Sequence, residues 1–231
     1  GGGKTYFLLT LIEALLHTNA VLYILDPKNS DLADLGTVMP NVYHTKEEMI
    51  DCVNAFYEGM VRRSEEMKRH PNYKTGENYA YLGLPPCFLI FDEYVAFFEM
   101  LGTKESVGLL SQLKKIVMLG RQAGYFLIVA CQRPDAKYFS DGIRDNFNFR
   151  VGLGRISELG YGMLFGSDVK KQFFQKRIKG RGYCDVGTSV ISEFYTPLVP
   201  KGHDFLQTIC SLAQARKDGT ATCEAKGDGT D

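Results

Sequence analysis

The chain has 231 residues, of which 45% are apolar and 23% are charged, and its 27 basic and 27 acidic residues give a formal net charge of 0. This is the composition of an ordinary globular domain. It excludes a general electrostatic attraction to polyanions, so any such partner must be held by a local patch. No apolar run approaches the roughly 18 residues of a membrane span. The six cysteines form no Cys-x-x-Cys pair, which favours a reducing cytosol over a disulfide framework or a structural zinc site.

The first half of the chain predicts two helices and two strands. Apolar residues recur at helical spacing over 7–16 and over 46–69. The segments AVLYILDP (20–27) and CFLIFDEY (87–94) are short and continuously apolar, which is typical of buried strands. The polar stretch 72–86 is expected to be a loop.

The second half alternates in the same way. A helix is predicted over 105–121, and Gly124 ends it. The further predicted elements are a strand over 125–134, a short helix over 141–147, a strand over 148–154, a short helix over 157–166, a hairpin of 179–187 with 192–199, and a helix over 204–216. Apolar strands that alternate with helices predict an α/β fold whose mostly parallel sheet has helices on both faces. We expect one domain over 1–215 and a disordered tail over 216–231.

The sequence begins with Gly1, Gly2, Gly3, Lys4 and Thr5, which fit the second half of the phosphate-binding loop G-x-x-x-x-G-K-[ST]. Glycines let successive backbone N–H groups turn toward one anion, and the start of a helix adds partial positive charge. In this interpretation Lys4 reaches the β and γ phosphates of a nucleotide and the Thr5 hydroxyl ligates Mg²⁺. The same five residues, taken alone, also fit a plain glycine-rich helix cap.

Two later strands end in polar residues that fit the same chemistry. Asp92 and Glu93 follow the apolar run FLIF, and Gln132 lies where the next strand ends. Asp92 would hold Mg²⁺ through its water shell, Glu93 would orient and polarise an attacking water, and Gln132 would sense the γ-phosphate. Each could also be a strand end that meets solvent. Together, a consecutive Asp-Glu and a polar sensor on the following strand point to motor-type ATPases of RecA-like fold.

Five segments, LDPKNSDL, LIFDEYVAF, GRQAGYFLIVACQRPDA, GIRDNFNFRVGLG and KGRGYCDVG, occur in this order. They resemble successive blocks of the FtsK/SpoIIIE superfamily of DNA translocases and, within it, the TcpA-like coupling ATPases of Gram-positive conjugative elements. The resemblance covers about residues 1–200. It implies a RecA-like P-loop ATPase of the Asp-Glu type, which has an additional strand and a catalytic glutamate, with ATP and Mg²⁺ as cofactors.

The same resemblance implies how such a protein works. It implies a homo-oligomeric, usually hexameric ring that pumps DNA through its pore during conjugation, with relaxase and secretion-channel proteins as further partners. The domain is then cytoplasmic, and the membrane anchor lies in a segment outside this sequence. ATP in such rings lies between subunits, and alignment of GRQAGY puts Arg121 at the position of the arginine finger that reaches in from the neighbour. Arg121 could instead be a cation that the end of its helix favours. Arg144 is a second candidate, although a surface ion pair explains it more simply.

The segment VKKQFFQKRIKGR over 169–181 is basic, and Phe173 and Phe174 interrupt its charges. Its cations are Lys170, Lys171, Lys176, Arg177, Lys179 and Arg181. Such a segment can hold a nucleic-acid backbone and stack bases, but a solvated face with inward-packed phenylalanines is favoured. The segment could also line a subunit interface near the nucleotide. Lys28, in DPKN, lies at a strand end and could contact a nucleotide, a neighbouring subunit or nothing specific, and the last of these is the expectation.

Three other functions fit the same residues. These are protein export, as in type VII secretion ATPases, a DNA pump for chromosome partitioning, and a nucleotide-dependent scaffold that does not hydrolyse ATP.

Overall fold

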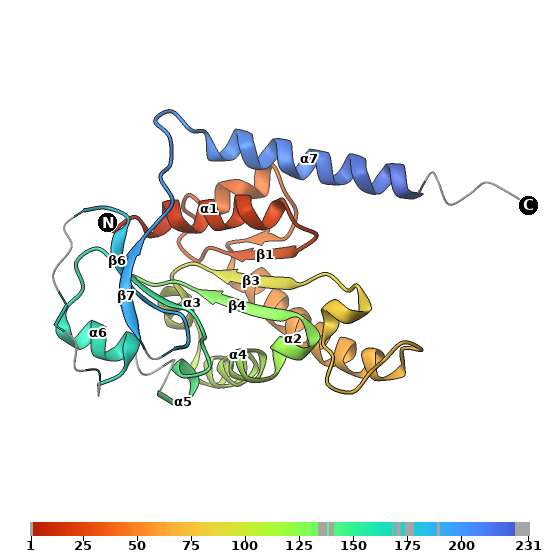
Figure 1. The fold of residues 1–231 in the computed structure, drawn as a ribbon, viewed down its shortest axis with the longest axis horizontal. Coiled ribbons are helices and arrows are strands. Elements are labelled where there is room, and N and C mark those ends of the chain that lie inside the picture. Colours follow the sequence, from red (N-terminus) through yellow and green to blue (C-terminus); the bar gives the residue numbers. More distant parts are fainter. Residues whose placement is uncertain are drawn as a thin grey trace, which may run out of the picture.

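The structure is a computed structural model, shown in Figure 1, and it describes residues 2–133, 138, 141–167, 169, 172–173, 178–188 and 190–224. Its helices are α1 (Lys4–Leu16), α2 (Lys46–Arg69), α3 (Tyr94–Met100), α4 (Thr103–Ala123), α5 (Asp141–Arg144), α6 (Glu158–Phe165) and α7 (Phe205–Glu224). Its strands are β1 (Val21–Leu25), β2 (Val42–Tyr43), β3 (Cys87–Phe91), β4 (Tyr125–Val129), β5 (Arg150–Leu153), β6 (Arg181–Asp185) and β7 (Ile191–Tyr195). Two short 3-10 helices are η1 (Ala33–Thr37) and η2 (Tyr79–Leu82).

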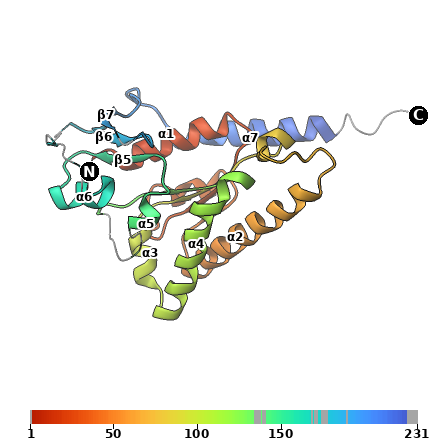
Figure 2. The same cartoon turned by 60° about the horizontal axis from the view of Figure 1, so that its bottom comes forward.

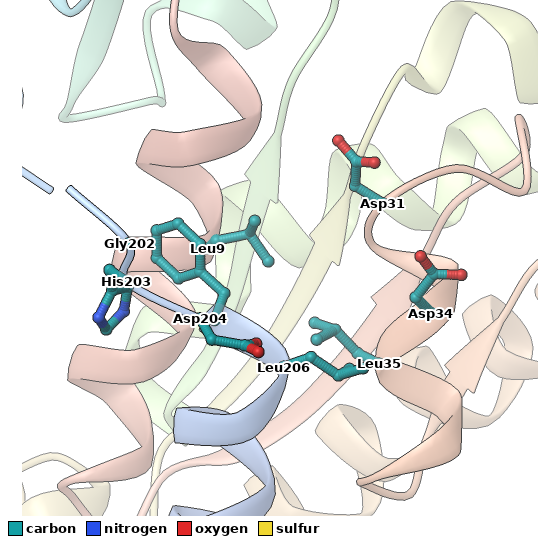
Figure 3. A pocket seen from close by; sticks show the side chains of 9 residues that line it. Leu9, Asp31, Asp34, Leu35, Gly202, His203, Asp204 and Leu206 are labelled. Carbon is teal, nitrogen blue, oxygen red and sulfur yellow. The ribbon is translucent and has the colours of Figure 1, made fainter. Parts of the chain in front are cut away.

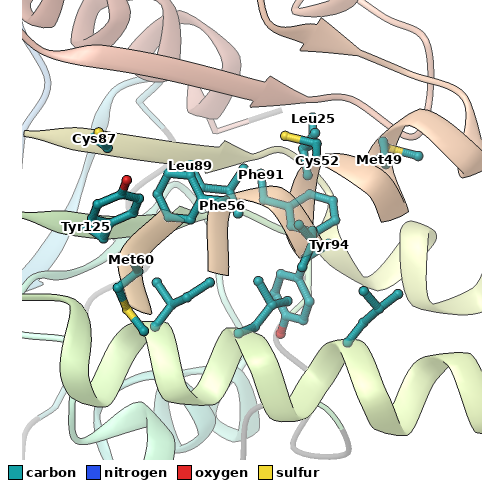
Figure 4. Packing of buried hydrophobic residues seen from close by; sticks show 14 of the residues in the cluster. Leu25, Met49, Cys52, Phe56, Met60, Cys87, Leu89, Phe91, Tyr94 and Tyr125 are labelled. Atoms are coloured by element: carbon teal, nitrogen blue, oxygen red, sulfur yellow. The ribbon is translucent and has the colours of Figure 1, made fainter. Parts of the chain in front are cut away.

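The larger sheet has the strand order β2-β1-β3-β4, and all its strands are parallel. Successive residues of β3 point to opposite faces. Leu89 and Phe91 pack toward α2 and α4, whereas Ile90 belongs to the core beneath α1 and α7 (Figures 1, 2 and 4). The predicted parallel sheet with helices on both faces is therefore confirmed.

The three remaining strands form a separate antiparallel sheet in the order β5-β6-β7. The predicted hairpin is present as β6 and β7. The predicted strand over 148–154, which we expected in the mostly parallel sheet, is present as β5 and pairs antiparallel with β6. Glycines explain the close approach of these two strands, because a Cβ atom on Gly182 would collide with the carbonyl oxygen of Gly152.

The ends of a helix agree with the prediction where residues next to it in the sequence cap it. Helix α2 spans the predicted 46–69, since the Thr45 hydroxyl accepts a hydrogen bond from the backbone N–H of Glu48 and basic residues occupy the last turn. Helix α3, in contrast, was not predicted. Helix α7 continues to Glu224, beyond the predicted end at 216. The added residues contain one glycine and no proline, so nothing in them forces the helix to stop. The end of the tail, 225–231, lies outside the described residues.

Helix α7 lies against α1 (Figure 1). The rings of Tyr6 and Phe205 meet edge to face with centroids 5.5 Å apart, and Ile209 is fully buried in the shared core. Further along α7, the Arg216 guanidinium donates a hydrogen bond of 2.6 Å to the carbonyl oxygen of Ala20, which lies between α1 and β1. Within the described residues, no helix combines the length and apolarity needed to cross a membrane.

Candidate nucleotide site

The parallel sheet brings three predicted polar segments to one edge. The register pairs Leu25 of β1 with Phe91 of β3, and Phe91 with Val129 of β4. The residues that follow these three strands therefore leave the sheet side by side. The start of α1 adds Lys4 to this edge, where it contacts both carboxylates that follow β3.

Lys4 bridges the two adjacent carboxylates. Its Nζ atom lies 2.7 Å from Oδ1 of Asp92 and 3.1 Å from Oε2 of Glu93. The two acidic side chains are each only 8% exposed. Burial by itself lowers the pKa of Lys4, but hydrogen bonds and charge interactions with Asp92 and Glu93 outweigh it and raise that pKa above its usual 10.5. Lys4 is therefore a cation at neutral pH, held by two anions.

Glu93 has partners on both of its carboxylate oxygens. The backbone N–H of Gln132 donates a hydrogen bond of 2.7 Å to Oε1, and the ammonium groups of Lys4 and Lys28 each lie 3.1 Å from Oε2. Burial by itself raises the pKa of Glu93, but these partners outweigh burial and hold that pKa below its usual 4.5. The Glu93 backbone has φ 49° and ψ 51°, a left-handed conformation that costs a non-glycine residue energy and is frequent at functional sites.

The loop after β1 positions Lys28, and sequence reasoning missed its role. The carboxylate of Asp26 is fully buried. It accepts hydrogen bonds from the backbone N–H groups of Lys28, Ser30 and Ala33 and from the Ser30 hydroxyl. Such an Asx turn shapes the loop so that Lys28 reaches Glu93. The expectation that Lys28 contacts nothing specific is wrong. The run DPKNS after an apolar strand was the available signal for the turn.

Glycines from three segments, one of which is the predicted phosphate loop itself, meet at the start of α1. Gly3 caps α1 with φ 97°, which suits glycine. The backbone N–H of Gly180 donates a hydrogen bond of 2.9 Å to the carbonyl oxygen of Gly2. A Cβ atom on Gly2 would lie 2.6 Å from the carbonyl oxygen of Leu153, and one on Gly154 would lie 2.9 Å from Cα of Gly2. The antiparallel sheet therefore packs directly against this loop and leaves no space for side chains there.

Several predicted site residues lie at or near this edge without a described side-chain contact to the carboxylates. Thr5 follows Lys4 in the first turn of α1 and is half-buried. The side chain of Gln132 is exposed, and its backbone N–H makes the contact to Glu93. Gly1 lies outside the described residues.

The structure does not bring Arg121 to this site. Arg121 is exposed in the last turn of α4, before β4, and the register of Cys87 with Tyr125 puts it at the opposite edge of the sheet. Arg144 forms an ion pair with Asp145 at 3.2 Å, in agreement with the simpler interpretation of that residue.

The basic segment over 169–181 is described only in part. Phe173 stacks on Tyr161 with ring centroids 4.1 Å apart, so it packs inward as the favoured interpretation expects. Lys170, Lys171, Phe174, Lys176 and Arg177 lie outside the described residues.

A cavity of about 430 Å³ lies elsewhere, between α1, η1 and the start of α7 (Figure 3). It is lined by Leu9, Asp31, Asp34, Leu35 and residues 202–206, and none of the carboxylates or lysines of the sheet edge lines it. His203, on its wall, pairs with Glu13 at 2.8 Å. Because the candidate chemistry is at the strand ends, this cavity is separate from the candidate site.

The residues at the sheet edge fit a magnesium nucleotide. The backbone N–H groups of the glycine loop at the start of α1 can bind a phosphate, and so can the ammonium group of Lys4. The oxygen atoms of Asp92 and Thr5 are of the kind that Mg²⁺ prefers. Glu93, held with its carboxylate ionised, can orient a water molecule.

Comparisons with known proteins show which proteins this chain resembles. The chain is 54% identical over 232 residues to the FtsK domain-containing protein YdcQ of Bacillus subtilis (strain 168), a match that covers 100% of the chain and 48% of the relative. It is 23% identical over 235 residues to the DNA translocase FtsK of Helicobacter pylori (strain J99 / ATCC 700824), covering 94% of the chain and 26% of the relative. No family model matches the chain.

Solved structures share the fold. The pCW3 conjugation coupling protein TcpA, in its monomer form with ATPgS, matches with a TM-score of 0.72 at 19% identity, over 92% of this chain and 62% of that one. The cytoplasmic domain of the type VII secretion ATPase EccC of Thermomonospora curvata matches with a TM-score of 0.63 at 18% identity, over 92% of this chain and 26% of that one. The predicted resemblance to FtsK and TcpA proteins is confirmed, and the chain spans about half the length of its relative YdcQ.

Proposed function

We propose that this chain is an ATP-hydrolysing motor domain of the Asp-Glu type. All of the chain aligns with about half of an FtsK domain-containing protein. The observation that carries the proposal is the Lys4 ammonium, which lies 2.7 Å from Asp92 and 3.1 Å from Glu93 at the start of a glycine-capped helix. A glycine loop, a lysine and an adjacent pair of buried carboxylates are the groups that binding and hydrolysis of a nucleotide triphosphate require.

Each group has a role in this proposal. The backbone of Gly1, Gly2 and Gly3 binds phosphate oxygens together with Lys4. Thr5 and Asp92 hold Mg²⁺, which supplies charge neutralisation at the phosphates when it is bound. Glu93 accepts a hydrogen bond from the attacking water and directs it in line at the γ-phosphorus.

Two further residues complete the proposed site. Gln132 lies beside Glu93, where its backbone N–H already binds that carboxylate. Arg121 acts in the site of a neighbouring subunit, because its place at the opposite edge of the sheet separates it from the carboxylates of its own chain.

The proposed work of the motor is translocation of DNA, and conjugative transfer is the leading role. The FtsK relative is a DNA translocase and the TcpA neighbour is a conjugation coupling protein. Assembly into a hexameric ring, attachment to the membrane by another segment, and contacts with relaxase and channel proteins belong to this proposal.

Replacement of Glu93 tests the catalytic assignment. In the full-length protein, Glu93→Gln keeps the size of the side chain and removes the charge that orients water. We expect binding of an ATP analogue within about twofold of wild type and a loss of turnover of at least 10²-fold. Nucleotide affinity and steady-state hydrolysis are the two measurements. Hydrolysis at the wild-type rate by this variant would contradict the proposal.

A second candidate function is protein export, which the likeness to the type VII secretion ATPase EccC favours. ATPase activity measured with single-stranded DNA, with double-stranded DNA and without DNA separates the two. Stimulation by DNA that falls steeply with salt supports the DNA motor, because neutralised phosphates release counterions. Stimulation by an exported polypeptide and no response to DNA supports export.

A further inference from the structure

A second lysine contacts the candidate catalytic glutamate, and the proposed function gives it no role. The Nζ atom of Lys28 lies 3.1 Å from Oε2 of Glu93. Its side chain is 45% exposed, whereas that of Glu93 is 8% exposed, so Lys28 reaches a buried carboxylate from the solvent side. The two residues are 65 positions apart, and the pairing of β1 with β3 brings them together.

Lys28 and Lys4 differ in what else they bind. Lys4 contacts both Asp92 and Glu93. In the part of the chain that the structure describes, Lys28 has an ion pair with Glu93 and none with Asp92. The proposed function requires the Lys4 ammonium group to bind a phosphate. When it does so, it no longer donates hydrogen bonds to the carboxylates of Asp92 and Glu93. Lys28 then remains as the charged partner that fixes Oε2 of Glu93, while the N–H of Gln132 fixes Oε1.

The loop that carries Lys28 is built to hold it in place. The buried carboxylate of Asp26 accepts the backbone N–H of Lys28 at 3.1 Å and that of Ser30 at 2.8 Å. The N–H of Asn29 closes the turn on the carbonyl oxygen of Asp26 at 3.0 Å. These hydrogen bonds restrict the backbone conformation of the loop at the end of β1. The Lys28 side chain therefore extends from a backbone position that is fixed.

We propose that Lys28 is a positioning residue for Glu93: its ammonium group and the backbone N–H of Gln132 hold the two carboxylate oxygens in the orientation that directs water at the γ-phosphate. This inference rests on the proposed role of Glu93. Lys28 acts through Glu93 and makes no contact with nucleotide in this scheme. Without the Lys28 ammonium group, the Glu93 carboxylate can turn, because the backbone conformation of Glu93 does not fix its side chain. Small displacements of a catalytic group lower the reaction rate strongly.

The test uses three variants of the full-length protein. Lys28→Met keeps the length of the side chain and removes the charge, Lys28→Arg restores a cation, and Lys74→Met removes an exposed lysine from the loop between α2 and η2 as a matched control. For Lys28→Met we expect kcat to fall roughly 10- to 100-fold while KM and the affinity for an ATP analogue stay within about twofold. We expect Lys28→Arg to recover most of kcat and Lys74→Met to match wild type.

A double variant separates this inference from the proposed function. If Lys28 acts through Glu93, then Lys28→Met in the Glu93→Gln background lowers the residual rate no further. Wild-type kcat in Lys28→Met, with Glu93→Gln inactive, overturns the role of Lys28 and leaves the role of Glu93 intact. The positioning role is also overturned if Lys28→Met lowers both the nucleotide affinity and the melting temperature and Lys28→Arg restores neither. That result would show that Lys28 only stabilises the fold. An active Glu93→Gln variant overturns the proposed function itself.

Discussion

Glu93 combines a low pKa with a buried, strained position, and this combination has a consequence for acid stability. Burial raises its pKa, but the N–H of Gln132 and the two lysines hold that pKa below 4.5. A carboxyl group whose pKa is lower in the folded state binds fewer protons folded than unfolded. The free energy that these partners contribute is therefore present above about pH 4.5 and is lost as the pH falls through the lowered folded value.

We therefore expect the free energy of unfolding to fall less between about pH 7 and pH 3.5 in Glu93→Gln than in wild type, because the variant has no carboxyl group to protonate at position 93. Urea unfolding at a series of pH values measures this difference. Glu99→Gln, which changes an exposed residue of α3, is the control and should follow the wild-type profile. Equal losses of stability in wild type and Glu93→Gln would show that this carboxylate has no such linkage.

At the residue scale, the sequence predicted which residues gather at the candidate site better than it predicted the contacts among them. Lys4, Asp92 and Glu93 were predicted because each occupies a fixed place after a glycine run or an apolar strand, and the structure brings them together. The catalytic and binding roles remain proposals. Lys28 was missed because its partner is 65 positions away. No local pattern reveals which of several strand-end residues will meet once strands pair.

The contact between the antiparallel sheet and the predicted phosphate loop gives a prediction at the scale of elements. Gly154 follows β5 with φ 73°, and a Cβ atom there would lie 2.9 Å from Cα of Gly2. Gly154→Ala should therefore cost about 1–2 kcal/mol in backbone strain and also displace the loop. We expect a lower affinity for ATP analogues in addition to the lost stability, as measured by calorimetry and thermal unfolding.

Gly83→Ala is the matched control for this change. Gly83 has a similar φ of 68° after η2, and nothing lies within 4 Å of a Cβ atom there. The control should lose comparable stability and keep its nucleotide affinity. If both variants bind nucleotide equally well, the antiparallel sheet does not support the loop.

Local signals explain which elements could be predicted. Helix α2 has a capping threonine before it and basic residues in its last turn, so both ends are visible in the sequence. Helix α3 has seven residues and follows an apolar strand directly, and short apolar runs do not distinguish helix from strand. The segment of β5 was predicted as a strand, but its antiparallel partner was not, because pairing depends on residues about 30 positions away.

The position of Arg121 gives a prediction for the whole assembly. If it acts only in a neighbour's site, then Arg121→Ala and Glu93→Gln subunits are each inactive alone and regain part of the activity when mixed. A Glu93→Gln subunit then offers its intact Arg121 to a site that has an intact Glu93. ATPase activity of mixed oligomers measures this.

A mixture of Lys4→Met with Glu93→Gln is the control for this experiment. Both changes affect residues that contact each other in one chain, so mixing restores no complete site. Mixtures of Arg121→Ala with Glu93→Gln that stay as inactive as their components would exclude Arg121 as a finger in trans.

The packing of α7 on α1 has a mechanical consequence. The contact begins at the rings of Tyr6 and Phe205, continues through the buried Ile209, and ends at the hydrogen bond from Arg216 to Ala20 in the segment that follows α1. A load applied along α7 is therefore shared as shear over the whole contact, rather than peeling it open from one end. Because packed interiors are stiff and transmit strain, such a load reaches α1 as a push or pull along its axis. That axis begins at Gly3 and Lys4, so tension on α7 acts on the predicted phosphate loop.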